Sequence, residues 1–442
     1  MDSNQEGKRS PMALLPIGVF LLLYVGLHAI LEYGFHVESG LNKAPITIAL
    51  LVALAVAFLP KRKQKMEEKL TMASKSLADK DMFATILTVL MAGAFVGVTG
   101  RESAEAVARF IVALVPVWAG PVVLFAGACL LSLSKGCAVG TIALVAPVAV
   151  AMADIPGLSH GMCIGAVISG AVFGDNLSIV SGASIAACKT HTCDMGMKYR
   201  ANSKVSIPAV FITLVILLVQ CYESDLGKGD IPSFKIALLL PYLLVLLGGL
   251  SGLSIFKTLL MGILSGAAIT LLIAGTDFVT MLENVGTGMA SVYELVIITV
   301  LTTVVCGIVR QRGGFEGSFK LFRKIFKGKI GGRLGISLLA GIMDVATANN
   351  TSAIMLAAPI AKQMAQENNI PAKDSAALID IFSSVVQGIL PYGTPMLMAV
   401  SIAASMGVAI SPFELLPFVL YPVVLAVWTL LDILVNTDIQ NV

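Results

Sequence analysis

Polar side chains gather within one apolar stretch of this chain, residues 170–187. The stretch is apolar enough to lie in a membrane, yet its centre holds an acid, an amide and three hydroxyls: Asp175, Asn176, Ser178, Ser181 and Ser184. Ionisable groups inside a membrane are costly and are usually functional. Gly174 and Gly182 flank the polar centre, which favours a helix that unwinds and frees backbone carbonyls. These residue types predict a binding site for an ion or small solute on a broken helix.

A second group of polar residues lies in the last third of the chain. Asp344 precedes a run of small and polar residues, and Pro391 and Pro395 interrupt a later apolar stretch. A sodium site needs several oxygen ligands and usually a carboxylate. We therefore expect a candidate Na⁺ site at Asp344, Asn349, Asn350 and Thr351, with Thr347 beside it. Weaker binding candidates are Gln387, Tyr392 and Thr394. Structural alternatives are a buried, hydrogen-bonded acid at Asp344 and a helix cap at Asp175.

The composition excludes a soluble globular protein. Of the 442 residues, 57% are hydrophobic and 13% are charged, which is typical of an all-α polytopic membrane protein. The expected spans are residues 12–33, 44–60, 82–100, 159–188, 205–222, 234–250, 255–274, 291–309, 376–406 and 412–434. Two pairs of shorter apolar arms, 119–134 with 140–153 and 334–347 with 352–364, predict re-entrant hairpins. This gives ten crossings, two of them broken, and two hairpins.

Lys and Arg set the expected orientation. Three connecting stretches are basic, residues 61–81, 189–204 and 310–333, and basic loops stay in the cytoplasm. Residues 101–116 are expected to lie at the outer interface and residues 276–288 in an outer loop. Both termini are then cytoplasmic, and the expected location is the inner membrane of a prokaryote. The apolar run after Lys8 and Arg9 is interpreted as a retained first span.

An internal repeat is the most informative pattern. Residues 147–152 match 359–364 at an offset of 212, and residues 168–174 match 382–388 at an offset of 214. Charges in the equivalent loops have opposite bias, which predicts two inverted copies and an alternating-access transporter. The expected domains are residues 1–81, repeat 1 (82–204), connecting helices (205–290) and repeat 2 (291–442).

Three segments resemble the NhaC-like branch of sodium/proton antiporters in the ion transporter superfamily: GDNLSIVS (174–181), ATANNTSAI (346–354) and DIFSSVVQGILPYGTP (380–395). The resemblance implies an elevator-type transporter, often a homodimer, with a scaffold and a mobile domain that carries the hairpins and broken helices. It implies that Asn349, Asn350 and Thr351 lie at a hairpin tip and bind a cation or substrate. Asp175, Asn176 and Ser178 would lie in the opposite broken helix.

The chain departs from this family pattern at two places. Gly182 stands where the family usually carries an aspartate, and Lys135, between Ser134 and Thr141, stands near the tip of the first hairpin. We expect the Lys135 ammonium to face Asp175 and to take the place of a cation, which would suit an anionic or zwitterionic cargo. The alternatives are that Lys135 snorkels to the interface or forms a static pair with Asp175.

The sequence thus predicts a secondary active transporter that moves a small organic anion or amino acid, coupled to H⁺ or Na⁺. One alternative is an authentic Na⁺/H⁺ antiporter with Asp175 or Asp344 as the exchanging carboxylate. An ion channel is an alternative of another class, and no enzyme is expected because no nucleophile, base and orienter recur at membrane depth. No cofactor beyond the coupling ion and no nucleic-acid partner is expected. Cys188, His191 and Cys193 lack a fourth metal ligand nearby.

Overall fold

The computed structural model describes residues 11–30, 46–59, 66–78, 80–222, 234–314 and 325–435, and every regular element in these ranges is helical. Eight helices are long and apolar enough to cross a membrane, or up to nine if residues 412–418 and 420–435, which meet at 55°, form one span. The predicted all-helical membrane fold is confirmed. The ten predicted crossings are not reached in the described part of the chain. Six of them are among the eight helices, and the other two of the eight, residues 117–135 and 328–347, are arms of the predicted hairpins.

The first three helices are α1 (Leu15–Ala29), α3 (Ile46–Phe58) and α4 (Met66–Leu77). The far ends of the first two predicted spans lie outside the described residues. Helix α4 corrects the prediction that residues 61–81 form only a loop. Its Lys69 is buried, and the Nζ atom donates to the Phe58 carbonyl at 2.8 Å, which caps the end of α3.

Helix α5 (Lys80–Leu114) is long and bends at Gly100, where φ is 65° and ψ is 177°. Only glycine adopts this backbone conformation readily. The bend separates the apolar first part of α5 from the segment after Arg101, which was expected to lie at an interface. The Arg101 guanidinium bonds to the Asp154 carboxylate at 2.5 Å and to the Met406 carbonyl at 2.7 Å, so the bend is anchored to two distant elements.

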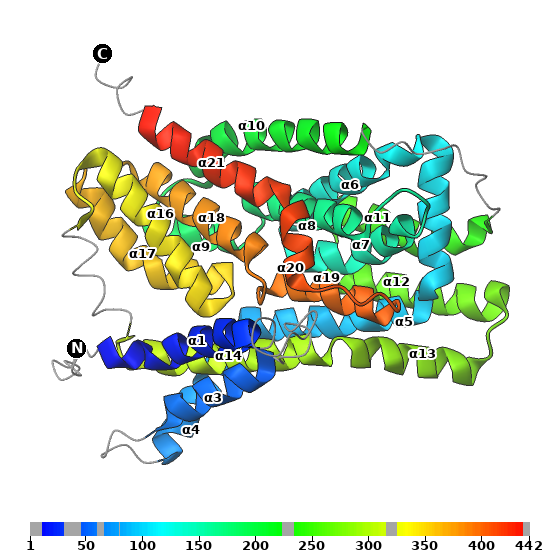
Figure 1. Cartoon of the computed structure of the whole chain (residues 1–442), viewed down its shortest axis with the longest axis horizontal. Helices are drawn as coiled ribbons and strands as arrows, with labels where there is room; N and C mark the ends of the chain where they lie inside the picture. Colours follow the sequence, from blue (N-terminus) through cyan, green and yellow to red (C-terminus); the bar gives the residue numbers. More distant parts are fainter. Residues whose placement is uncertain are drawn as a thin grey trace.

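The two predicted hairpins and two broken helices are present (Figure 1). The first hairpin, HP1, consists of α6 (Gly120–Lys135) and α7 (Ala138–Ala153), and the second, HP2, of α16 (Gly328–Thr347) and α17 (Asn350–Glu367). The first broken helix comprises α8 (His160–Leu177) and α9 (Gly182–His191), and the second α18 (Ala372–Ile389) and α19 (Thr394–Ser405). HP2 lies toward the left of Figure 1 and HP1 toward the right, with the broken helices between them.

The remaining helices surround this centre. They are α10 (Met195–Tyr222), α11 (Leu240–Leu250), α12 (Ile255–Ile269), α13 (Phe278–Ser291), α14 (Tyr293–Gln311), α20 (Pro412–Leu415) and α21 (Leu420–Val435). Helix α13 corrects the outer loop expected at residues 276–288. It packs so closely on α5 that a Cβ atom at Gly97 would lie 2.3 Å from the Asn284 carbonyl oxygen. Small residues permit such close helix contact in membranes.

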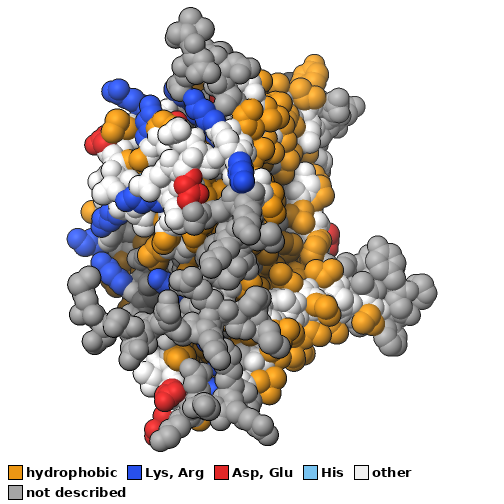
Figure 2. All heavy atoms as spheres, turned by 90° about the vertical axis from the view of Figure 1, so that its left-hand side faces the viewer, with side chains coloured by type: hydrophobic (Ala, Val, Ile, Leu, Met, Phe, Trp, Pro, Cys, Tyr) orange, Lys and Arg blue, Asp and Glu red, His pale blue; other side chains and the backbone are white. Residues whose placement is uncertain are grey.

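Helix α10 starts earlier than the sequence indicated. Residues 189–204 were predicted to form a basic cytoplasmic loop, but α10 begins at Met195 and buries Lys198. At the left-hand end of the molecule in Figure 1, Lys and Arg side chains gather on part of the surface, and hydrophobic side chains dominate one flank (Figure 2). This distribution fits a protein whose sides face lipid and whose end faces water.

Candidate functional site

The two hairpin tips share one backbone geometry. In HP1, Gly136 is left-handed with φ 62°, and Cys137 is extended and accepts from the Gly140 amide at 3.3 Å. In HP2, Ala348 is left-handed with φ 48°, and Asn349 is extended and accepts from the Ser352 amide at 2.9 Å. Each HP2 position follows its HP1 counterpart by 212 residues.

The breaks in the two helices also correspond at this offset. Ser178 and Ser181 bound the first break, and Leu390 and Gly393 bound the second, all with extended backbone. The two breaks therefore correspond at an offset of 212 residues, two fewer than the offset of 214 predicted for this segment from the sequence. At 212, Asp175 corresponds to Gln387.

Each break is fixed to a neighbouring hairpin. The Ser178 hydroxyl donates to the Leu133 carbonyl at 2.8 Å, and the Tyr392 hydroxyl donates to the Val345 carbonyl at 2.8 Å. Leu133 and Val345 are again 212 residues apart. Both carbonyls lie in the last turn of a helix, where intrahelical donors are lacking. Ser178 and Tyr392 thus hold the breaks and the tips together.

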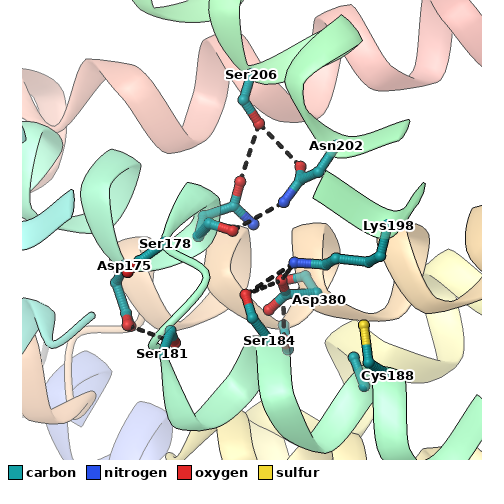
Figure 3. A network of polar contacts seen from close by, with 12 residues as sticks. Asp175, Ser178, Ser181, Ser184, Cys188, Lys198, Asn202, Ser206 and Asp380 are labelled. Carbon is teal, nitrogen blue, oxygen red and sulfur yellow. Dashed lines mark hydrogen bonds and ion pairs between the residues drawn. The ribbon is translucent and has the colours of Figure 1, made fainter. Parts of the chain in front are cut away.

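Asp175 joins the first break to the tip of HP2. The Ser181 hydroxyl donates to its Oδ1 atom at 2.8 Å, and the Asn350 side-chain amide donates to its Oδ2 atom at 3.2 Å. The Asn350 backbone amide in turn donates to the Gln387 side chain on α18. Figure 3 shows Asp175 and Ser181 bonded to each other beside the unwound segment. Four of the residues named from the sequence, Asp175, Ser181, Asn350 and Gln387, thus lie next to one another.

A cavity of ≈ 270 Å³ lies at this junction. Its walls include both tips and the first residues of four helices, namely α7, α9, α17 and α19. Of the predicted site residues it is lined by Asp175, Ser181, Asn349, Asn350, Thr351, Gln387 and Thr394. Asp175 contributes the one carboxylate in this lining, and no lysine or arginine of the described residues contributes to it. We call this space the central cavity.

A second cavity of ≈ 240 Å³ shares part of this wall. Thr85, Asn349, Thr351 and Thr394 line both cavities. The second cavity continues along α14 past hydroxyl side chains to Lys75 and Arg310, and it includes Thr347 and Tyr392. A polar path therefore leads from the central cavity toward a basic end of the bundle.

Lys135 does not face Asp175, which corrects its predicted position. Its ammonium donates to the Gly248 carbonyl at 3.2 Å, to the Thr258 hydroxyl at 3.0 Å and to the Leu253 carbonyl. The Ser134 hydroxyl donates to the Gly249 carbonyl at 2.7 Å. The Gly248 and Gly249 carbonyls lie in the last turn of α11, where a cation is favourable, and the Leu253 carbonyl lies in the turn that follows. The end of α6 is thus bound to the turn between α11 and α12, away from the central cavity.

The lysine that pairs with a carboxylate at the centre of the bundle is Lys198, and that carboxylate belongs to Asp380. The Lys198 ammonium pairs with the Asp380 carboxylate on α18 and donates to the Ser184 hydroxyl at 2.8 Å (Figure 3). Ser184 itself donates to Asp380 Oδ2 at 2.9 Å. Asp380 is fully buried. The signal that was missed is the spacing of Lys198, Asn202 and Ser206 at every fourth residue, which forms one polar stripe on α10.

Asn176, on α8, contacts this stripe and does not line the central cavity. The Asn202 side-chain amide donates to the Asn176 carbonyl at 2.8 Å, and the Ser206 hydroxyl lies 3.0 Å from the Asn176 side-chain oxygen. Figure 3 shows Asn202 and Ser206 pointing toward the chain near Ser178. Asn176 and Ser178 thus stabilise the break, whereas Asp175 and Ser181 face the central cavity. Thr141 is buried and donates to the Cys137 carbonyl at 3.0 Å within α7.

Asp344 is fully buried on α16, and neither carboxylate oxygen has a hydrogen-bond partner among the described residues. It lines neither cavity. Asn350 Oδ1 accepts from the Thr351 amide at 2.8 Å, as Asn349 accepts from Ser352, so both amide oxygens close the HP2 tip locally. The four residues predicted as one Na⁺ site therefore lie in two different environments.

No group of three or more His, Cys, Asp or Glu side chains in the described ranges is placed to hold a metal ion. His191 lies between Cys188 and Cys193 in sequence, but its ring nitrogens lie 3.1 Å from the Ala187 carbonyl and 3.0 Å from the Ser375 hydroxyl. The ring thus connects α9 to α18.

Residues 5–221 match the Na⁺/H⁺ antiporter family. This confirms the resemblance to sodium/proton antiporters in the part of the chain that contains HP1 and the first broken helix, and the matched family is one of transporters and not of enzymes. The chain is also similar to the crystal structure of the Alcanivorax borkumensis YdaH transporter, described as having an unusual topology, with 15% identity and a TM-score of 0.42. That similarity covers 81% of this chain and 89% of the other. No curated protein matches the chain.

Proposed function

Because residues 5–221 match the Na⁺/H⁺ antiporter family, we propose that the protein is a secondary active transporter whose cargo binds in the central cavity against Asp175. The observation that carries this proposal is the position of Asp175. Its carboxylate lines the cavity and is held by one group from the first break and one from the HP2 tip. A site formed by both halves of the fold is expected of a transporter built from repeats.

The charges around the cavity favour a cargo with a positive group. Lys135 is bound to the turn between α11 and α12, and Lys198 is paired with Asp380. Neither ammonium is available to an organic anion. Each oxygen of Asp175 accepts one hydrogen bond and retains a lone pair for a further donor. We therefore favour an amino acid over a simple organic anion as the cargo.

Asp344 is the proposed site of the coupling ion. An ionised carboxylate without a partner is very costly in a dry interior, so this group either holds a proton or binds a cation. It also lies in the last turn of α16, where the negative end of the helix dipole disfavours a bare carboxylate. Coupling to H⁺ or Na⁺ at Asp344, separate from the cargo at Asp175, is consistent with both observations.

Alternating access in this proposal depends on inverted repeats and an elevator motion. The equal backbone geometry at an offset of 212, and the entry of HP1 and HP2 from opposite ends of the molecule (Figure 1), support the repeats. The hairpins and broken helices would form the mobile part, and a homodimer of the remaining helices in lipid would form the scaffold. The Lys and Arg side chains in Figure 2 support a cytoplasmic location for that end, in the inner membrane of a prokaryote.

The proposal is tested with the purified full chain in liposomes. Uptake of labelled amino acids is measured with a pH gradient, with a Na⁺ gradient and with neither, for the wild type, Asp175→Asn and Asp344→Asn. We expect Asp175→Asn to weaken cargo binding by about 2 kcal/mol or more, roughly 30-fold, because a cargo cation loses its buried counter-charge. Asp344→Asn should retain exchange of cargo across the membrane but lose accumulation driven by the ion gradient.

Lys135→Met is the matched control, since its ammonium lies outside the central cavity, and it should retain the wild-type affinity for cargo. Wild-type transport by Asp175→Asn would refute the proposed site. Exchange of Na⁺ for H⁺ without any carbon-containing cargo, abolished by Asp175→Asn, would favour the second candidate, an authentic Na⁺/H⁺ antiporter. The observation in favour of that candidate is the family match itself.

A further inference from the structure

The start of α9 forms a wall of the central cavity and has amide donors without a hydrogen-bond partner among the described residues. Its first intrahelical hydrogen bond runs from the Ile185 amide to the Ser181 carbonyl, so the amides before Ile185 have no partner within the helix. A serine at the N-cap normally accepts from one of these amides. Ser181 does not, because its hydroxyl is turned to Asp175. The positive end of α9 is therefore uncapped where it meets the cavity.

A second, independent observation lies on α18. Ser384 lines the same cavity, is 2% exposed, and its hydroxyl has no hydrogen-bond partner among the described residues. A buried hydroxyl without a partner costs about 1–3 kcal/mol, so such groups are normally satisfied by protein, water or ligand.

The register of the two helices places Ser384 beside the start of α9. His191 near the end of α9 contacts Ser375 at 3.0 Å, and Ser184 contacts Asp380 at 2.9 Å. The helices therefore run in opposite directions, and one further turn along α18 brings Ser384 toward the start of α9, where Ser384 and Gly182 line the same cavity.

Gly182 leaves space at this position. A Cβ atom there would meet nothing closer than the Thr351 hydroxyl oxygen at 3.6 Å. Thr351 comes from the HP2 tip and also lines the central cavity. The space is thus bounded by amide donors of α9 and by two hydroxyls, and Asp175 lies on the other side of Ser181.

We infer that this space is an anion subsite that binds the carboxylate of a zwitterionic cargo, while the cargo's ammonium binds Asp175. Helix N-termini with free amides bind carboxylates in this way. The charged groups of an α-amino acid lie close together, and here the two subsites are neighbours on either side of Ser181, whose hydroxyl bonds to Asp175 and does not cap α9. This inference rests on the proposed function and specifies the cargo as an α-amino acid with both charges free.

The test measures thermal unfolding of the purified full chain with each standard α-amino acid, with the methyl ester and the decarboxylated amine of the one that stabilises most, and with Na⁺ alone. The free amino acid should bind at least about tenfold more tightly than its ester or amine. Ser384→Ala should weaken binding of the free acid by about five- to tenfold and leave the ester unchanged.

Gly182→Asp would place a competing carboxylate at the start of α9 and should abolish binding of the free acid. Lys135→Met, whose side chain lies outside the central cavity, is the control variant and should preserve that binding. Equal binding of acid and ester, or retained acid affinity in Gly182→Asp, would overturn the inference. If the ester also binds and requires Asp175, the proposed cargo site survives without the anion subsite. Stabilisation by Na⁺ in the absence of any amino acid that is lost in Asp175→Asn would overturn both the subsite and the amino-acid cargo, because it would place Na⁺ at Asp175 and not at Asp344.

Discussion

Lys198 on α10 and Asp380 on α18 form an ion pair in which the side chains are only 2% and 0% exposed. Ser184 on α9 bonds to both, and Asp380 Oδ1 has no further partner among the described residues. The pair thus joins three helices directly behind the wall of the central cavity. Since the two charges balance each other, Asp175 remains the group that gives the cavity its charge.

Removing one partner of this pair should be more damaging than removing both. Lys198→Met or Asp380→Leu leaves the partner's buried charge uncompensated, and we expect each to destabilise the protein by about 3–5 kcal/mol. The double variant Lys198→Met/Asp380→Leu replaces both charges with apolar groups of similar size and should recover most of that loss. Thermal unfolding of the four proteins in detergent measures the coupling. A double variant less stable than either single variant would contradict this account.

The hairpins, the helix breaks and the choice of Asp175 as a candidate binding residue could be predicted from the sequence, because each has a local signal. Short apolar arms, prolines and polar residues within apolar runs can be recognised without knowing which segments pack against them. The sequence did not predict the position of Lys198, because a loop and the first turn of a helix have similar composition, and only the stripe formed with Asn202 and Ser206 distinguishes them. Nor did it predict the position of Lys135, because the direction of a lysine at a tip depends on a turn more than a hundred residues away.

Lys135 should contribute to stability and not to binding. Its ammonium has two carbonyl partners and one hydroxyl partner at the turn between α11 and α12. Lys135→Met keeps most of the apolar stem and leaves those acceptors unsatisfied, so we expect a loss of about 1–3 kcal/mol in unfolding free energy. Thermal unfolding with and without cargo separates the two effects. A lower midpoint with an unchanged shift on adding cargo is the expected result, and a reduced shift would place Lys135 in the site after all.

Asp277 lies outside the membrane-spanning segments and contributes to the stability of the folded protein in a pH-dependent way. Hydrogen bonds from the Thr280 side chain and then from the Thr280 and Val279 amides hold the pKa of Asp277 below its ordinary value. A carboxyl group whose pKa is lowered on folding stabilises above its unfolded pKa, and the effect is lost as pH falls through the folded pKa. Asp277→Asn retains an N-cap oxygen but no charge.

The wild type should therefore unfold at a higher temperature than Asp277→Asn at neutral pH, and the two midpoints should converge in acid. The comparison is made by thermal unfolding across an acid-to-neutral pH series. A difference that stays constant through the acid range would show that the charge of Asp277 has no part in capping α13.

A side chain at Gly136, in the HP1 tip, should be unfavourable for two reasons, backbone strain and a clash with the first break, and a control variant can separate them. It has φ 62°, and a Cβ atom would lie 2.5 Å from the Ser181 amide nitrogen. Gly136→Ala therefore adds backbone strain of about 1–2 kcal/mol and also pushes the tip away from the first break. Gly100 has φ 65° with no atom within 4 Å of an added Cβ, so Gly100→Ala adds strain alone. Both variants should lose stability in thermal unfolding, but Gly136→Ala alone should also weaken cargo binding, because Ser181 would no longer hold Asp175 in place. Equal cargo affinity in the two variants would mean that contact between the tip and the break does not position the site.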